Sequence, residues 1–306
     1  LNHARGGNIA RGGARLDSIV HAMPPDSIDG ELHVTEQGET IGQNYGLRSN
    51  ALRWLERAFG VLGLARVAQR RGEAVPEDEA SRDLMRRIAA RSRDAWRRLC
   101  VEDVEFQDFF RAATPIDVIE RMQVGSRSIW EPGGRGALAI RSTPWVFAWS
   151  QARFFLPGWY GAGTALEEAI AAHGVEWLRD IFRRWSFFRL LVEDVESQLA
   201  RTDFAIAAHY AGLASATSSA CLPLLRAEFE RCRGAVLAIR EQADLLDADA
   251  TQQRSIQLRN PYVDPMNLMQ VDLLRRWRAT AREDQNLFEA LVASVSGISQ
   301  GLQTAG

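Results

Sequence analysis

The second half of the chain consists of segments with helical periodicity, and this pattern limits the fold more than any other feature. From Ala165 onward, apolar side chains recur at the spacing of one helix face. The blocks lie near 165–172, 175–199, 203–214, 222–246, 263–283 and 284–303. Because an amphipathic helix buries its apolar face against other elements, we predict a C-terminal region made almost wholly of packed helices.

The first 150 residues predict a mixture of helices and short strands. The helical patterns lie at about 16–23, 48–71, 77–100 and 114–121. In the last of these, Thr114 is the expected N-cap and Pro115 the first helical residue. We expect four short strands, at 1–5, at 31–35 and on either side of the glycine-rich loop 133–136. The apolar segment Trp145–Trp149 belongs to the last of them.

Composition excludes several classes of protein. With 306 residues, 46% of them apolar, the chain can bury a full core, and its net charge of −2 argues against general nucleic-acid binding. Its three cysteines form no ligand cluster or disulfide framework, so a reducing cytoplasm is the expected setting. All 37 basic residues are arginine, which excludes a Schiff-base lysine. Polar residues and Pro157 interrupt the apolar run from 145 to 163, so we expect no membrane span.

The N-terminal stretch HARGGNIARGG, residues 3–13, places Arg5 and Arg11 among four glycines. Glycine allows backbone N–H groups to come close to a ligand, and the guanidinium fork fits phosphate or carboxylate oxygens. An anion site is one interpretation, and a disordered Gly-Arg tail with the same composition is the other. The helical pattern that follows at once favours the anion site. Because the chain begins inside this motif and without Met, we expect an N-terminal part of the gene product to precede it.

These residues and several later motifs resemble phosphoenolpyruvate carboxylase, whose mobile loop reads HGRGGxxGRGG. The matching landmarks follow in the family's order along the whole chain. They are VTEQGE at 34–39, FRAATP at 110–115, GSR at 125–127, IRSTPWVFAW at 140–149, LPGWYGAGTAL at 156–166, QLRNPYVDPMN at 257–267 and the closing GISQGLQTAG.

The resemblance implies a fold that is mostly α with an α/β barrel. Residues 1–163 would supply the second half of an eight-stranded, TIM-like barrel with inserted helices. Residues 164–306 would form a C-terminal helical region that carries an effector site. The missing N-terminal portion of the same protein and further copies of the chain, as a homotetramer, are the implied protein partners.

The resemblance also implies an activity, the anaplerotic fixation of carbon dioxide. Phosphoenolpyruvate and bicarbonate would react through carboxyphosphate and the enolate of pyruvate to give oxaloacetate and phosphate. The implied catalytic residues are His3, Arg11 and Arg127, and the implied substrate-binding residues are Arg5, Gly6, Gly7 and Arg141. The reaction implies Mg²⁺ or Mn²⁺, whose ligands we expect outside this chain. Taken singly, each arginine is more often a surface or ion-pair residue, and only the match to the family's motifs favours the anion-binding role.

The family's inhibitor site, for aspartate or malate, would use Arg11, Arg201, Arg259 and Thr304. Arg201 stands where the family has Lys, and Thr304 where it has Asn, so we expect weakened feedback inhibition. Ala4 and Ala10 replace two loop glycines, and the segment 128–131 lacks the family's basic residues. These departures motivate an alternative, a catalytically weakened relative that acts as a binding or regulatory subunit. A third possibility, an unrelated helical scaffold, leaves the glycine loop unexplained.

Overall fold

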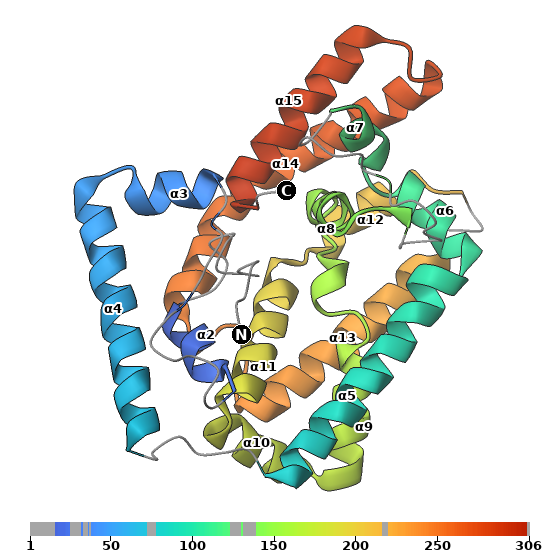
Figure 1. Ribbon diagram of the computed structural model, residues 1–306. Helices are drawn as coiled ribbons and strands as arrows, with labels where there is room; N and C mark the ends of the chain where they lie inside the picture. Colours follow the sequence, from blue (N-terminus) through green and yellow to red (C-terminus); the bar gives the residue numbers. More distant parts are fainter. Residues whose placement is uncertain are drawn as a thin grey trace. The chain divides into compact units, whose positions relative to one another are not determined.

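The computed structural model of the chain is shown in Figure 1. It describes residues 16–24, 32, 36, 38–71, 78–122, 130, 139–215 and 220–304, without the side chains of 38–40 and 43. Packing divides the chain into two compact units, one of Leu1–Met85 with Glu176–Glu193 and the other of Arg86–Val175 with Asp194–Gly306. The division into domains expected from the family, at residue 163, stays a prediction.

Helices make up most of the described residues. In chain order they are α2 (Leu16–Ala22), α3 (Gly38–Tyr45), α4 (Arg48–Arg70), α5 (Glu79–Arg97), the π-helical turn η1 (Arg98–Glu102), α6 (Val104–Ala112), α7 (Ile116–Arg121), α8 (Ser142–Gln151), the 3₁₀ turn η3 (Leu156–Gly158), α9 (Ala162–His173), α10 (Val175–Arg184), α11 (Ser186–Arg201), α12 (Phe204–Ala211), α13 (Cys221–Arg240), α14 (Ala250–Ala279) and α15 (Gln285–Leu302). None of these helices is long and apolar enough to cross a membrane.

In the first unit, the short helix α2 packs against α4. Leu16 and Val20 are buried, and Trp54, Ala58 and other partly buried residues of α4 cover them. The ion pair between Arg57 and Asp17, 2.8 Å long, lies beside this small core. Of the apolar residues that give α4 its helical spacing in the sequence, Leu52, Leu55, Phe59 and Val67 are exposed. The spacing therefore predicts the helix but not the face that packs against α2.

The core of the second unit is built on aromatic rings from α6 and α8. Phe106 stacks on Trp149 with the ring centroids 5.6 Å apart, and Phe110 lies 4.4 Å from Trp145. The carboxylate of Asp103 accepts a hydrogen bond of 3.0 Å from the Phe106 amide and so caps α6. Large aromatic side chains bury much apolar area, which fixes α8 in the interior.

The motif LPGWYGAG allows α9 to approach α13 closely. Gly161 has φ of 89°, and a Cβ at Gly163 would lie 2.6 Å from the Cys232 amide nitrogen of α13. Glu228, also on α13, accepts hydrogen bonds from the Gly161 and Thr164 amides, at 3.2 and 2.8 Å. A carboxylate from one helix therefore caps the N-terminus of the other.

The long helix α14 and the last helix α15 run antiparallel and form the C-terminal hairpin, drawn orange to red in Figure 1. Asp249 caps α14, since its carboxylate accepts from the Gln252 amide at 2.9 Å. The helix continues through Pro261 and Pro265. The sequence predicted a start near 263, because proline normally ends a helical pattern, and this boundary is wrong.

Other expectations can be checked in the described residues. The helices expected at 16–23, 48–71, 77–100 and 284–303 are confirmed. Trp145–Trp149 is not a strand but part of α8, and Thr114 is not an N-cap, because its hydroxyl donates back to the Phe110 carbonyl at 2.7 Å. The block 175–199 is divided at Trp185, and the block 222–246 ends its helix at Arg240.

The barrel expected from the family is not visible in the described part of the chain. That part contains no strand, only one antiparallel bridge between Trp130 and Ile140, on either side of the expected glycine loop. The strands expected at 1–5 and 31–35 lie outside the described residues, apart from Leu32. An all-helical region is therefore what the structure supports, and the half-barrel remains a prediction.

Candidate functional site

Most of the expected catalytic loop falls outside the described residues. This holds for His3, Arg5, Gly6, Gly7, Arg11 and Arg127. The structure does describe Arg141 and the three remaining effector residues, and it describes what anchors the segments on either side of Arg127.

Arg141 is placed by the buried helix α8. It is the N-cap residue, with φ −60° and ψ 148°, and its carbonyl accepts from the Trp145 amide at 3.2 Å. Its side chain is half-buried, while Trp145 and Trp149 behind it are buried. A guanidinium at the N-terminal end of a helix adds its charge to the positive end of the helix dipole, and both attract anions.

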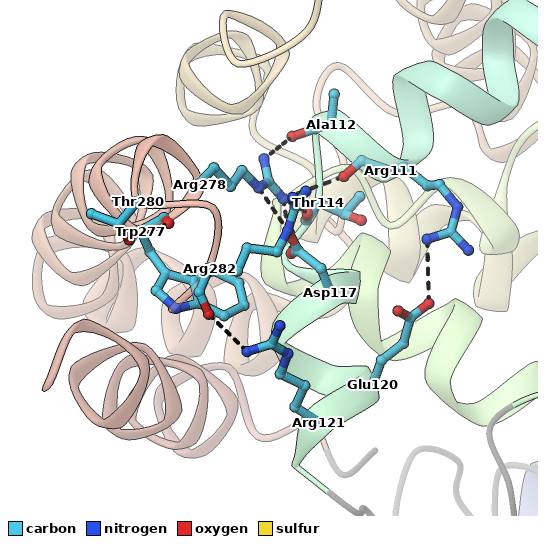
Figure 2. Close-up of polar contacts among 10 residues, drawn as sticks. All are labelled: Arg111, Ala112, Thr114, Asp117, Glu120, Arg121, Trp277, Arg278, Thr280 and Arg282. Carbon is cyan, nitrogen blue, oxygen red and sulfur yellow. Dashed lines mark hydrogen bonds and ion pairs between the residues drawn. The ribbon is translucent and has the colours of Figure 1, made fainter. Parts of the chain in front are cut away.

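The segment that leads to Arg127 is anchored by Arg278 at the end of α14 (Figure 2). All three guanidinium nitrogens of Arg278 donate hydrogen bonds. They reach the carbonyl oxygens of Arg111, Ala112 and Thr114, at 3.2, 2.6 and 2.8 Å. They also reach both carboxylate oxygens of Asp117, each at 3.0 Å. One side chain therefore ties the turn between α6 and α7 to the C-terminal hairpin.

Two further arginines complete this contact. Arg282 donates to the same carboxylate of Asp117 at 3.0 Å, and Arg121 donates to the Arg282 carbonyl at 2.9 Å. The Arg121 guanidinium also lies 5.0 Å from the centre of the Trp277 ring, a cation–π contact. Because α7 ends at Arg121, the chain enters the GSR segment from a firmly held helix.

The two acids of α7 differ in their charge balance. Burial by itself raises the pKa of Asp117, but the hydrogen bonds and charges of Arg278 and Arg282 outweigh it, so the pKa lies below its ordinary value. Burial, helped by the charge of Asp117, raises the pKa of Glu120. Its only ion-pair partner is the half-exposed Arg111, at 3.5 Å, among the contacts within the described residues. Asp117 is thus firmly ionised, whereas Glu120 is poorly compensated.

The expected effector residues come together at the C-terminal hairpin. Arg201 is the last residue of α11, and Arg259 lies in α14. Arg259 donates from Nε to the Ser255 carbonyl at 2.9 Å and from Nη1 to the Leu302 carbonyl, at the end of α15, at 3.3 Å. Thr304 lies two residues after Leu302, and its amide donates to the Ser299 carbonyl at 3.0 Å.

The two effector arginines repel each other. Burial lowers the pKa of Arg201, the charge of Arg259 lowers it further, and Asp194 opposes this. Burial also lowers the pKa of Arg259. Two cations held near each other and partly removed from water are costly unless an anion balances them.

Two polar atoms of this group have no hydrogen-bond partner in the part of the chain that the structure describes. They are Nε of Arg201 and Oγ1 of Thr304, and both are buried. A buried donor without an acceptor costs roughly 1–3 kcal/mol. Together with the like charges, these atoms describe a site that an acid with two carboxylates would satisfy. The site residues Arg201, Arg259 and Thr304 stay a prediction as to function.

The anchoring residues Arg278, Asp117 and Arg282 were not expected from the sequence. Asp117 follows the FRAATP motif in IDVIER, but no local pattern marks it, because its partners Arg278 and Arg282 lie 161 and 165 positions further along the chain. The only signal is weak, a cluster of arginines in LLRRWRATAR at 273–282. Such charge rows are more often a solvated helix face.

The described residues do not fit a metal centre. No group of three or more His, Cys, Asp or Glu side chains among them lies close enough to hold an ion. Glu36, which lies in the VTEQGE motif, accepts a hydrogen bond from Asn44 at 2.9 Å. The cysteines Cys100, Cys221 and Cys232 are free and buried. Burial raises the pKa of each thiol, which makes them poor ligands and nucleophiles.

Comparison with known proteins gives one family. A family model described as phosphoenolpyruvate carboxylase matches residues 1–306. A phosphoenolpyruvate carboxylase of Xanthomonas oryzae pv. oryzae is 46% identical over 305 residues, covering 99% of this chain and 33% of the relative. Those of Rhodothermus marinus and Trichormus variabilis are 38% and 34% identical, covering 100% and 99% of the chain and 33% and 32% of the relatives. The chain spans about a third of the length of the curated relatives it matches.

Proposed function

Because the chain belongs to the phosphoenolpyruvate carboxylase family, we propose that the full-length protein containing it forms oxaloacetate and phosphate from phosphoenolpyruvate and bicarbonate. The observation that supports this proposal for the chain itself is the placement of Arg141. Its backbone forms the N-cap of a helix whose aromatic residues are buried in the core. A guanidinium carried by a backbone placed in this way suits a substrate that has both a phosphate and a carboxylate.

The chemistry requires positive charge at fixed positions. A bicarbonate oxygen attacks the phosphorus, the bond from phosphorus to the enol oxygen breaks, and carboxyphosphate and the enolate of pyruvate result. Carboxyphosphate then releases carbon dioxide and leaves phosphate, and the enolate carbon attacks the carbon dioxide to form oxaloacetate. Every species is anionic, so prearranged guanidinium groups stabilise the charges that develop.

The proposed roles follow the family's motifs. Arg5 and Arg141 hold the phosphate, with close approach allowed by Gly6 and Gly7. The catalytic residues are His3, which positions bicarbonate or carries a proton, Arg11 from the loop, and Arg127 in the same anion pocket. Closure of the loop keeps water from protonating the enolate, which would give pyruvate. The anchoring of α7 by Arg278 supports the role of Arg127, because it holds the segment that leads to it.

We further propose that the enzyme depends on Mg²⁺ or Mn²⁺, which supplies Lewis-acid charge at the phosphate when bound. Its ligands come from outside the described residues, and the N-terminal portion present in the relatives is the expected source. A homotetramer in the cytoplasm remains the expected state of the whole protein.

An assay of the full-length protein tests the activity. We expect oxaloacetate formation that depends on bicarbonate and on Mg²⁺ or Mn²⁺, and no turnover with either metal would refute the proposal. Arg141→Gln should lower kcat/KM for phosphoenolpyruvate by at least about 100-fold. Arg91→Gln is the matched control, since Arg91 pairs with Glu168 at 2.7 Å on the surface and should leave turnover unchanged. An Arg141→Gln variant as active as the unmodified protein would show that Arg141 does not hold the substrate. An unmodified protein without turnover would instead favour the alternative of a binding subunit, which no described contact supports.

The same protein should carry a regulatory anion site at Arg201, Arg259 and Thr304, with Arg11 from the loop. The supporting observations are the mutual repulsion of the two guanidinium groups and the unpartnered donors beside them. L-Aspartate or L-malate, with two carboxylates, matches two cations. Measuring the binding of L-aspartate to the full-length protein by calorimetry tests the site, and an affinity unchanged in Arg259→Gln would exclude it.

A further inference from the structure

Arg153 is the most buried arginine among the described residues whose exposure is given, with 1% of its side chain accessible. It follows the end of α8 in a left-handed conformation, with φ of 61°. A buried guanidinium destabilises the folded protein unless carboxylates or other acceptors surround it. The acceptors of the Arg153 hydrogen bonds therefore show which elements this residue connects.

The donors of Arg153 reach two other helices. Nη1 donates to Asp264 at 2.7 Å and Nη2 to Asn260 at 3.0 Å, both on α14. Nη2 also lies 3.7 Å from the carboxylate of Asp203, the N-cap of α12. These four residues, called the Arg153 cluster below, connect the end of α8 to the start of α12 and to the middle of α14.

Both contacts lie beside the arginines of the proposed effector site. Asn260 follows Arg259 directly in α14, and Asp203 comes two residues after Arg201. The main chain strengthens the second link, because the Asp203 amide donates to the Arg153 carbonyl at 3.0 Å. An anion that draws Arg201 and Arg259 together would therefore act on both sides of the Arg153 cluster.

The other end of the connection is α8, which begins at Arg141. Gln151, the last residue of this helix, donates to the Val295 carbonyl at 3.1 Å. Its own carbonyl accepts from Asn267 of α14 at 2.8 Å. The end of α8 is thus bonded to the C-terminal hairpin, and a rigid helix carries a displacement of its end to its start.

We propose that Arg153 is a positioning residue that couples the anion site at Arg201 and Arg259 to the substrate contact at Arg141. This inference rests on the proposed function. The Nε atom of Arg153 is buried and has no acceptor among the described residues, so only the partners on α14 and α12 hold the guanidinium there. When those partners shift, Arg153 follows them, and α8 moves with it. Coupling of this kind is reciprocal, so substrate should weaken or strengthen aspartate binding by the same factor.

The test measures the Kd for phosphoenolpyruvate by calorimetry on the full-length protein. Two ratios are taken: the Kd with L-aspartate over the Kd without it, and the Kd of the Arg259→Gln variant over that of its parent. When the parent has Arg153, we expect each ratio to differ from one by at least about fivefold, and when the parent is Arg153→Gln, both ratios should approach one. In Arg153→Lys, which keeps the charge without the fork, they should be partly restored.

Two further variants keep the test informative if Arg153→Gln fails to fold. Asp264→Asn retains an acceptor for Arg153, and Asp203→Asn retains the cap of α12, but each removes a charge from the cluster. Both should lower the coupling ratio while the protein stays folded at the temperature of the titration, which its midpoint of thermal unfolding checks. Arg91→Gln, in the surface ion pair with Glu168, should leave the ratio unchanged.

Ratios that stay the same in all the cluster variants as in the unmodified protein would overturn the proposal. It would also be overturned if neither the addition of aspartate nor the single substitution Arg259→Gln changed the Kd for phosphoenolpyruvate. The binding readout separates this outcome from failure of the proposed activity. A protein that forms no oxaloacetate refutes the activity, whatever the coupling of its binding sites.

Discussion

Arg278 and Arg201 are both withdrawn from water in the second unit, but they differ in what surrounds them. Arg278 uses all three guanidinium nitrogens on three carbonyl groups and one carboxylate. Arg201 faces a second cation, Arg259, and its Nε has no acceptor in the described part of the chain. The first guanidinium is complete without a ligand, whereas the second is not.

The difference separates a structural arginine from a binding one. A saturated charge contributes to folding, and its removal leaves Asp117 with fewer partners. An unsaturated charge next to a like charge costs stability in the absence of a ligand, and an anion recovers that cost on binding. The variants below test this distinction, because the two substitutions should change stability in opposite directions.

The largest effect is expected from Arg278→Met. It removes five hydrogen bonds and leaves Asp117, only 12% exposed, with the outer partner Arg282 alone. Loss of one partner of a buried pair costs about 3–5 kcal/mol, so the midpoint of urea unfolding should fall clearly. Arg276→Gln is the control, because Arg276 is 61% exposed and lies 3.7 Å from Asp272. It should change stability by less than about 0.5 kcal/mol, and equal losses in the two variants would show that Arg278 is not an anchor.

Arg201→Met should have the opposite sign. With no ligand present, the substitution removes a desolvated charge and its repulsion with Arg259, and we expect about 1 kcal/mol of added stability. Added L-aspartate should raise the thermal midpoint of the unmodified protein but not that of the variant. A destabilised Arg201→Met variant that still responds to aspartate would contradict the comparison.

Thr304→Asn should strengthen the anion site. The buried Thr304 hydroxyl has no hydrogen-bond partner among the described residues, and an amide at this position both donates and accepts. One added hydrogen bond is worth about 1 kcal/mol, so the Kd for L-aspartate should fall roughly fivefold. Calorimetric titration of the full-length protein measures this, and Thr304→Ser, which adds no amide, is the control. Weaker binding by Thr304→Asn would place the carboxylates elsewhere.

The smallest effect concerns Glu120, the poorly compensated neighbour of Asp117. Because its pKa is raised in the folded protein, the ionised form costs stability at neutral pH. Glu120→Gln should therefore add about 0.5 kcal/mol at pH 7. The gain should vanish as the pH falls below the ordinary pKa of Glu, about 4.3, where the carboxyl is protonated in both states. Asp117→Asn should destabilise at pH 7, because the pKa of Asp117 is lowered, and a gain there would reverse the assignment.

The sequence predicts helices well where amphipathic patterns are long, as in α5 and α15. It fails at Trp145–Trp149, because a short apolar run looks the same in a buried strand and in a helix buried on all sides. It also fails at Thr114, whose hydroxyl returns to the helix before it and does not cap the next one. Because of Pro261 and Pro265, the sequence predicts too short a helix for α14. Packing against α15 outweighs the backbone hydrogen bonds that the two prolines cannot donate.

The candidate site likewise contains residues that the sequence predicts and residues that only the structure reveals. Arg141 and Arg259 were predicted from motifs that resemble the family's, and Arg201 and Thr304 from two positions at which the chain departs from the family. Arg278 and Arg153 carry no such mark, because their partners are distant in the chain. Asp117 and Arg278 are 161 positions apart, and Arg153 and Asp264 are 111 apart. No local pattern reports contacts of that range.

The order of motifs by itself determined the family, most helix positions and the arginine-rich character of the expected pockets. Only the tertiary structure decided which arginines are satisfied by the protein and which keep a buried donor that has no acceptor in the described part of the chain. The reason is physical. A side chain's propensity and period are local properties, but the pairing of a charge depends on distance through space and on how much water the surrounding helices exclude.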